Sequence, residues 1–173
     1  LGTPIIQNSL YRPAGRGIKV AIIDSGIDDR HPDLTTRVIN RYNLTNEEEL
    51  DACGHGTMMA GIVCGTGFLS RIKFRGIAPA TKLIDVKIVD KTGIAYVHNI
   101  LLGLEKIFND DIEGEIDIIL FGLNVPRASD VSNVISRACN KLARTKILIS
   151  PAGNFGPDPF MIGAPASANG VFC

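Results

Sequence analysis

The amino-acid sequence predicts an α/β fold in which helices cover both faces of a doubly wound, mostly parallel β-sheet. Short apolar runs with the length of buried strands alternate along the chain with longer segments of helical pattern. The strand-like runs are continuously apolar, which is typical of parallel strands buried between two layers of helices. A chain of 173 residues is long enough for one such domain, and no internal repeat divides it.

Four buried strands are expected, each rich in Ile, Val and Leu. They span residues 18–23, 82–89, 116–123 and 146–150. Helices are expected at residues 57–66, 96–108 and 130–143. The helix at 96–108 carries one apolar face, formed by Val97, Ile100, Leu101, Leu104 and Phe108. Ser129 or Asp130 is a candidate N-cap for the last helix.

Charge and composition exclude several classes of function. The chain has 18 Lys and Arg and 18 Asp and Glu, so its formal net charge is zero. A neutral chain offers no electrostatic footprint for nucleic acid or for an anionic membrane, and neither is expected as a partner. The apolar runs are short and interrupted, so no membrane-spanning helix is expected.

The four cysteines show no spacing typical of a zinc site, because no CxxC or Cys/His ligand pattern occurs. Cys64 and Cys139 fall among apolar residues of predicted helices, where we expect buried free thiols.

Polar residues flanked by glycine follow two of the predicted strands and open the first helix. Asp24-Ser25-Gly26 follows the first strand, and Ala152-Gly153-Asn154 follows the fourth. Gly54-His55-Gly56-Thr57 lies where the first helix begins. Functional groups of open parallel sheets gather at the carboxyl ends of the strands, so these segments are the candidate site.

Each of these residues also has a purely structural interpretation: Asp24 and Asn154 as turn residues, and His55 as a capping or loop residue. Together they make chemical sense. A buried carboxylate fixes the tautomer of an imidazole, the imidazole takes a proton from a hydroxyl nucleophile, and an amide donor stabilises the oxyanion.

Several segments in order resemble the subtilase family of serine proteases. VAIIDSGIDDRHPDL at residues 20–34 resembles the segment around the family's catalytic aspartate, and GHGTMMAG at 54–61 resembles its catalytic-histidine motif. GIAP at 76–79 and PAGNFG at 151–156, the latter similar to the segment of the oxyanion asparagine, complete the set. The resemblance implies that residues 1–173 are the N-terminal and central part of a single subtilisin-like peptidase domain.

The resemblance implies a role for each matched residue. Asp24 would be the orienting acid, His55 the general base and acid, and Asn154 the donor to the oxyanion. Further residues would border a protein or peptide substrate: Gly93, Ile94, Ala95, Gly122, Leu123, Ala152 and Gly153. Gly122 and Asn124 stand where the family usually has Ser and Gly, which leaves the shape of the cleft open.

The family's Gly-Thr-Ser nucleophile motif is absent from this sequence. In the family order the serine comes last, and the chain ends at Val171-Phe172-Cys173, where a further strand should begin. We therefore expect a fold truncated at its C-terminus, a serine on a C-terminal portion, and no peptidase activity from residues 1–173 alone. A truncated sheet leaves an unpaired apolar edge, so that remainder is the expected partner.

The resemblance also bears on cofactors and location. None is expected to be required, but Asp33 matches a ligand position of one family calcium site, which makes calcium a candidate structural ion. One carboxylate is too few for an ion that takes about six to eight oxygens. Family habit favours a secreted protein, and a cytoplasmic location is the alternative.

Two other classes of function remain as alternatives. The first is a non-catalytic relative that binds peptides or a partner protease. The second is a metal-dependent hydrolase using Asp24, Asp33 and His55, which is disfavoured because it has too few ligands at helical spacing.

Overall fold

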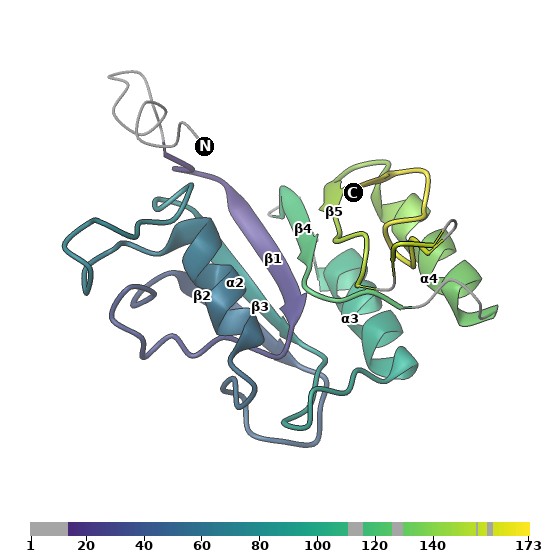
Figure 1. The fold of residues 1–173 in the computed structure, drawn as a ribbon, viewed down its shortest axis with the longest axis horizontal. Helices are drawn as coiled ribbons and strands as arrows, with labels where there is room; N and C mark the ends of the chain where they lie inside the picture. Colours follow the sequence, from purple (N-terminus) through teal and green to yellow (C-terminus); the bar gives the residue numbers. More distant parts are fainter. Residues whose placement is uncertain (1–13, 111–115, 126–129, 155, 159–160) are drawn as a thin grey trace.

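The chain forms one parallel sheet with helices packed on both faces. A computed structural model describes residues 14–110, 116–125, 130–154, 156–158 and 161–173. Among these residues the sheet has the strand order β2-β3-β1-β4-β5-β6, and every pair is parallel (Figure 1). The strands are β1 (Lys19–Asp24), β2 (Val38–Asn43), β3 (Lys82–Lys87), β4 (Ile118–Phe121), β5 (Ile147–Ile149) and β6 (Val171–Phe172).

Alternation of side chains along the strands builds two hydrophobic clusters, one on each face of the sheet. The helices are α2 (His55–Cys64), α3 (Val97–Asp110) and α4 (Asp130–Leu142). Val20 and Ile22 of β1 belong to the cluster that includes Ala60 of α2. Ala21 and Ile23 belong to the cluster that contains the buried residues of α3 and α4. The predicted doubly wound architecture is therefore confirmed.

The chain order explains why the functional groups meet at β1. The chain passes from β1 to β2 and returns to β3, then continues on the other side of β1 through β4 and β5. Strand order thus reverses around β1, and its carboxyl end lies between those of β3 and β4. Such a reversal is where open α/β sheets place their ligands.

The structure contains one strand that was not predicted, and its first described helix begins earlier than predicted. Residues 38–43 were not expected as a strand, and they form β2 at the edge of the sheet, where half-exposed polar side chains replace an apolar run. The helix expected at 57–66 begins at His55 instead and ends at Cys64. The strand expected to begin near residue 171 is present as β6, and it pairs with β5.

All four cysteines are free, and two of them are buried. Burial raises the pKa of the Cys64 thiol to about 11 and that of Cys139 to about 12, so both stay protonated. The prediction of buried free thiols at these two positions is confirmed. No helix in the described part of the chain is long and apolar enough to cross a membrane.

Candidate active site

Asp24 and His55 lie in direct contact at the carboxyl end of β1. Asp24 is the last residue of its strand and its side chain is 3% exposed, whereas His55 opens α2 and is 44% exposed. The imidazole Nδ1 of His55 lies 2.8 Å from Oδ2 and 2.9 Å from Oδ1 of Asp24. The backbone N–H of Ser25 donates to Oδ1 of the same carboxylate at 2.6 Å.

This contact fixes the role of each ring nitrogen. An ionised carboxylate can only accept hydrogen bonds, so the proton of a neutral His55 ring lies on Nδ1. The other nitrogen, Nε2, is then unprotonated and can accept a proton from a nucleophile. A buried acid that holds an exposed imidazole in this tautomer is the arrangement of a general base.

Ser25 and Asp51 connect the end of β1 to the start of α2. The hydroxyl of Ser25 donates to Oδ1 of Asp51 at 2.9 Å and accepts the backbone N–H of Gly56 at 3.0 Å. The Ser25 side chain thereby links the residue after Asp24 to the residue after His55, and it holds the two segments together. Ser25 was predicted only as part of a polar segment, and Asp51 had no predicted role.

Asp51 caps α2, whose N-cap residue is Gly54 and so has no side chain to do this. Its carboxylate accepts the backbone N–H groups of Gly54 at 2.7 Å and Thr57 at 3.0 Å, and the Thr57 hydroxyl at 2.6 Å. Burial raises the pKa of Asp51, but these hydrogen bonds outweigh burial and hold it below its usual value. The charged form of Asp51 therefore stabilises the helix end that carries His55.

Two glycines allow the close approach of the elements that carry the site. A Cβ on Gly56 would overlap the carbonyl oxygen of Gly26, so α2 can lie this close to the loop after β1 only with glycine there. Gly122 follows β4 and continues its pairing with β1, since its N–H donates to the carbonyl of Ile23 at 3.0 Å. A Cβ on Gly122 would overlap the Asp24 carboxylate, so β4 can lie this close to the acid only with glycine there.

The remaining predicted residues follow the carboxyl ends of β3, β4 and β5. Gly93 has φ of 83°, and the turn that holds Gly93 and the exposed Ile94 is closed by a backbone pair between Val89 and Ala95. Half-buried Leu123 follows β4.

Ala152, Gly153 and the exposed Asn154 follow β5. Asn124 ties the last two segments together, because its side-chain amide donates to the carbonyl of Pro151 at 3.0 Å. In the described part of the chain no hydrogen bond joins Asn154 to Asp24 or His55. The structure therefore brings Asp24, His55 and Gly122 into contact, and Asn154 lies farther along the same edge.

Hydrogen bonds already engage one carboxylate oxygen of Asp33, the candidate calcium ligand. One carboxylate oxygen of Asp33 accepts the backbone N–H of Leu69 at 3.1 Å and lies 3.4 Å from the Thr66 hydroxyl. Within the described residues no group of three or more His, Cys, Asp and Glu side chains could hold a metal ion. A calcium ion needs about six to eight oxygens, so ligands would have to come from elsewhere.

A cavity of about 500 Å³ lies on the flank of α2 away from the Asp24–His55 contact. His31, Asp33, Met58, Ile62 and Phe74 are among its lining residues. Neither Asp24 nor His55 lines it, so it is not the place of the proposed chemistry. His55 instead lies at an open edge of the described structure.

Comparison with known proteins gives a consistent result. The subtilase family matches residues 15–173. Serine protease AprX of Bacillus subtilis is 34% identical over 91% of this chain and 37% of its own length. An intracellular serine protease of Paenibacillus polymyxa is 33% identical over 82% of the chain and 43% of its own length. Subtilisin of Bacillus pumilus is 31% identical over 96% of the chain and 62% of its own length.

The fold has a close counterpart among solved structures. Sphericase superposes with a TM-score of 0.78 over 98% of this chain, at 23% sequence identity. The match covers 57% of the Sphericase chain. The chain thus spans between about a third and two thirds of the length of the proteins that it matches.

Proposed function

Because the chain belongs to the subtilase family, we propose that it supplies the acid and the base of a serine endopeptidase. The supporting observation is the contact of 2.8 Å between His55 Nδ1 and Asp24 Oδ2. The nucleophilic serine of the proposed Asp-His-Ser triad belongs to a portion of the protein outside residues 1–173, since the described site provides no hydroxyl in its place.

The proposed reaction begins with proton transfer to His55. Nε2 takes the proton of the serine hydroxyl as its oxygen attacks the carbonyl carbon of the scissile peptide. The imidazolium formed is stabilised by Asp24, and it then protonates the leaving amine. Asn154 would donate to the developing oxyanion, a contribution worth about 10²–10³-fold in turnover for the equivalent donor of subtilisin, where it was measured in this same family.

We assign the substrate to the edge that carries these residues. Gly93, Ile94 and Ala95, with Gly122 and Leu123, would pair with an extended protein or peptide chain, while Ala152 and Gly153 would border the pocket for one of its side chains. The hydrogen bond from Asn124 to Pro151 supports this assignment, because it holds two of these segments side by side.

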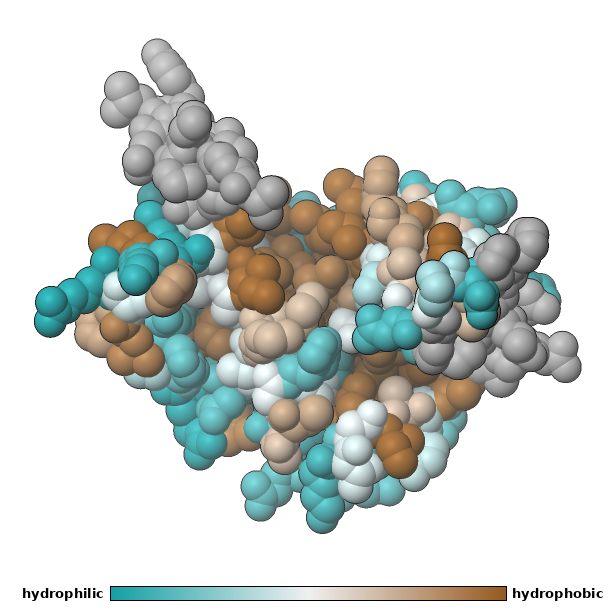
Figure 2. Space-filling view, in the orientation of Figure 1, coloured by the Kyte–Doolittle hydropathy of each residue, from teal (hydrophilic) through white to brown (hydrophobic). Residues whose placement is uncertain are grey.

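An uncovered apolar surface supports a further partner, the C-terminal remainder of the protease. Ile118 and Leu120 of β4 pair with Ile147 and Ile149 of β5, so all four point to the face that α2 covers at β1. Ile147 is 49% exposed and Phe172 of β6 is 67% exposed. Figure 1 shows α2 in front of the sheet, and Figure 2, in the same orientation, shows hydrophobic surface beside this position. A helix that carried the serine at its start could cover this surface.

The test is made on the complete protein. A fluorophosphonate probe should label one serine outside residues 1–173, and the labelled protein should no longer cleave a peptide. A complete protein that takes no label and cleaves no peptide, yet binds peptides, would instead be the non-catalytic relative.

The proposed chemistry needs no cofactor, and a structural calcium ion near Asp33 stays a prediction. Location also stays a prediction, with secretion and the cytoplasm as the two alternatives. Among the relatives, two are named intracellular serine proteases.

A further inference from the structure

Strand β3 carries two charged side chains in the interior of the protein that the proposed reaction does not use. Asp85 and Lys87 are 0% and 1% exposed. They are separated by one residue, so both point to the face of the sheet that α2 covers. Buried charges are costly, and each must be held by partners.

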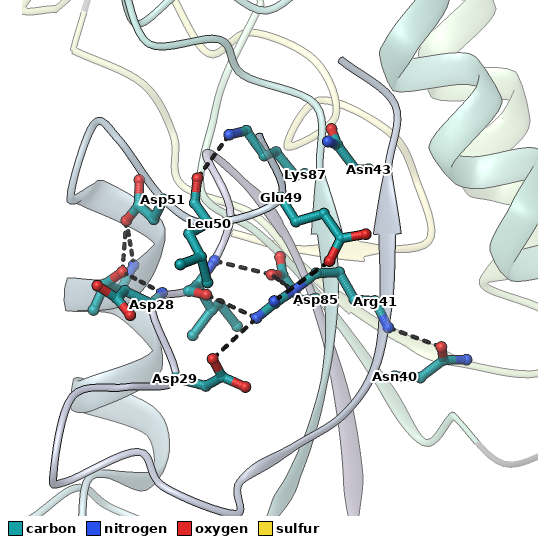
Figure 3. Close-up of polar contacts among 12 residues, drawn as sticks. Asp28, Asp29, Asn40, Arg41, Asn43, Glu49, Leu50, Asp51, Asp85 and Lys87 are labelled. Carbon is teal, nitrogen blue, oxygen red and sulfur yellow. Dashed lines mark hydrogen bonds and ion pairs between the residues drawn. The ribbon is translucent and has the colours of Figure 1, made fainter. Parts of the chain in front are cut away.

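The partner of Asp85 is Arg41 of β2 (Figure 3). Together they hold both backbone groups of Ile27. Oδ2 of Asp85 accepts the N–H of Ile27 at 2.9 Å and that of Arg41 Nε at 2.8 Å. Nη2 of Arg41 in turn donates to the carbonyl of Ile27 at 2.9 Å. Asp29 and Glu49 lie farther from the guanidinium, at 3.6 and 4.0 Å.

Ile27 lies in the short loop between Asp24 and the contact with α2. The carbonyl of Gly26, the residue before it, packs beneath Gly56 of α2. The N–H of Asp28, the residue after it, donates to the Thr57 hydroxyl of α2 at 2.9 Å. The position of Ile27 therefore sets where α2, with His55 at its start, rests against the loop that begins at Asp24.

Lys87 holds the other loop that leads to the site. Its Nζ donates to the carbonyls of Glu48 at 2.7 Å and Leu50 at 2.8 Å, immediately before Asp51. Asp51 then caps α2. One buried strand thus fixes the loop after the proposed acid and the loop before the proposed base.

We propose that the Asp85–Arg41 pair is a positioning device for the Asp24–His55 contact, a role that rests on the proposed function. The pair touches neither substrate nor reacting atoms, so both are positioning residues. They act by fixing the N–H and C=O of Ile27. The loop that contains Ile27 in turn sets the position of α2.

A double substitution separates positioning from stability. Replacing a buried ion pair by apolar residues of similar volume is often neutral for stability, whereas removing one partner strands a charge. Asp85→Leu with Arg41→Met therefore strands no side-chain charge, but it leaves the N–H and C=O of Ile27 without partners and should lower Tm, so a control of lowered stability is needed. A misplacement of catalytic groups by about 1 Å costs about 10²-fold in rate.

The experiment compares this double variant of the complete protease with the wild type. We expect kcat to fall by about 10–100-fold while KM changes by less than about twofold. Val20→Ala, at the opposite end of β1, is the control: it should lower Tm and leave kcat unchanged. If kcat of the double variant equals that of Val20→Ala, the positioning role is wrong. If the double variant does not fold, Asp85→Asn replaces it in the experiment. This variant keeps one acceptor oxygen, so its kcat should fall by less than that expected for the double variant.

A second measurement does not depend on turnover. The NMR signal of the Nδ1 proton of His55 reports its hydrogen bond to Asp24. We expect this signal to shift or to broaden in the double variant and to stay unchanged in Val20→Ala. An unchanged signal in the double variant would overturn the positioning role, even if the wild type proved to have no peptidase activity. Absence of labelling in the wild type would overturn the proposed function alone.

Discussion

Asp24 and Asp51 are two carboxylates on either side of one helix end, and they have different roles. Asp24 accepts a hydrogen bond from the imidazole of His55, so its charge orients and stabilises the proposed base. Asp51 accepts backbone N–H groups of α2 and the Ser25 hydroxyl, so its charge serves the geometry. Substitution of Asp24 should therefore lower reactivity, and substitution of Asp51 should lower stability.

Substitution at the Asp24–His55 pair should abolish reactivity without unfolding the protein. In the complete enzyme, Asp24→Asn should slow fluorophosphonate labelling by about 10⁴-fold, because the amide holds the wrong tautomer. His55→Ala should slow it at least as much. Asp28→Asn, at an exposed ion pair with Arg30, is the control and should label at the wild-type rate. Undiminished labelling of both active-site variants would overturn the assigned roles.

Substitution of Asp51 should lower stability. Asp51→Ala removes the cap of α2 and leaves donors unsatisfied, which should cost about 1–3 kcal/mol in the free energy of unfolding. The pKa of Asp51 is lowered in the folded protein, so its contribution is present above the unfolded pKa and is lost as the pH falls. Urea unfolding at neutral and acidic pH measures both effects. If the difference in unfolding free energy between wild type and variant stays constant as the pH falls, this linkage is wrong.

At the level of elements, the order of strands and helices was predictable because apolar period and length determine it. The strand β2 was missed because edge strands need no apolar run, and the polar Asn40, Arg41 and Asn43 interrupt its apolar residues. Asp24 and His55 could be found because one directly follows a predicted apolar strand, the other lies between two glycines at a predicted helix start, and both segments resemble family motifs. The role of Asp51 could not be found from the sequence. It depends on the path of the loop before α2, and this path is held by contacts of Lys87 that are distant in sequence. Asp85 and Lys87 were detectable as charges inside an apolar strand.

The charge of Asp85 on β3 should make stability depend on pH. Burial, with a smaller contribution from Asp51, raises the pKa of Asp85 to about 6, although Arg41 and the Ile27 N–H lower it. The folded protein therefore binds a proton before the unfolded chain does, and this contribution to stability falls as the pH rises from about 4 to about 6. Asp85→Asn should remove this component, about 3 kcal/mol over that range. Unfolding of both proteins across the range measures it, and parallel curves would contradict it.

The exposed apolar face of β5 should be buried in the complete protein. Ile149→Asp should then lower the stability of that protein by at least about 3 kcal/mol, because the new charge loses its water. Ile39→Asp on the edge strand β2, 47% exposed, is the matched control and should cost much less. Equal losses of unfolding free energy at the two positions would show that nothing covers β5.

At the level of the whole molecule, the proposed reaction takes its base from residues 1–173 and its nucleophile from another portion of the protein. Purified residues 1–173 should therefore show no peptide hydrolysis, because loss of the nucleophile costs about 10⁶-fold in turnover in subtilisin, the measured case from this family. Addition of the separately produced remainder should restore fluorophosphonate labelling. Hydrolysis by residues 1–173 alone, free of contaminating protease, would refute the proposed division of the triad.

The free state of all four cysteines has a consequence for handling the protein. No covalent cross-link holds this part of the chain, so dithiothreitol or glutathione should leave its fold intact. Alkylating reagents should reach the exposed thiols of Cys53 and Cys173 and spare Cys64 and Cys139, which stay protonated. Folding of this part therefore needs no disulfide bond.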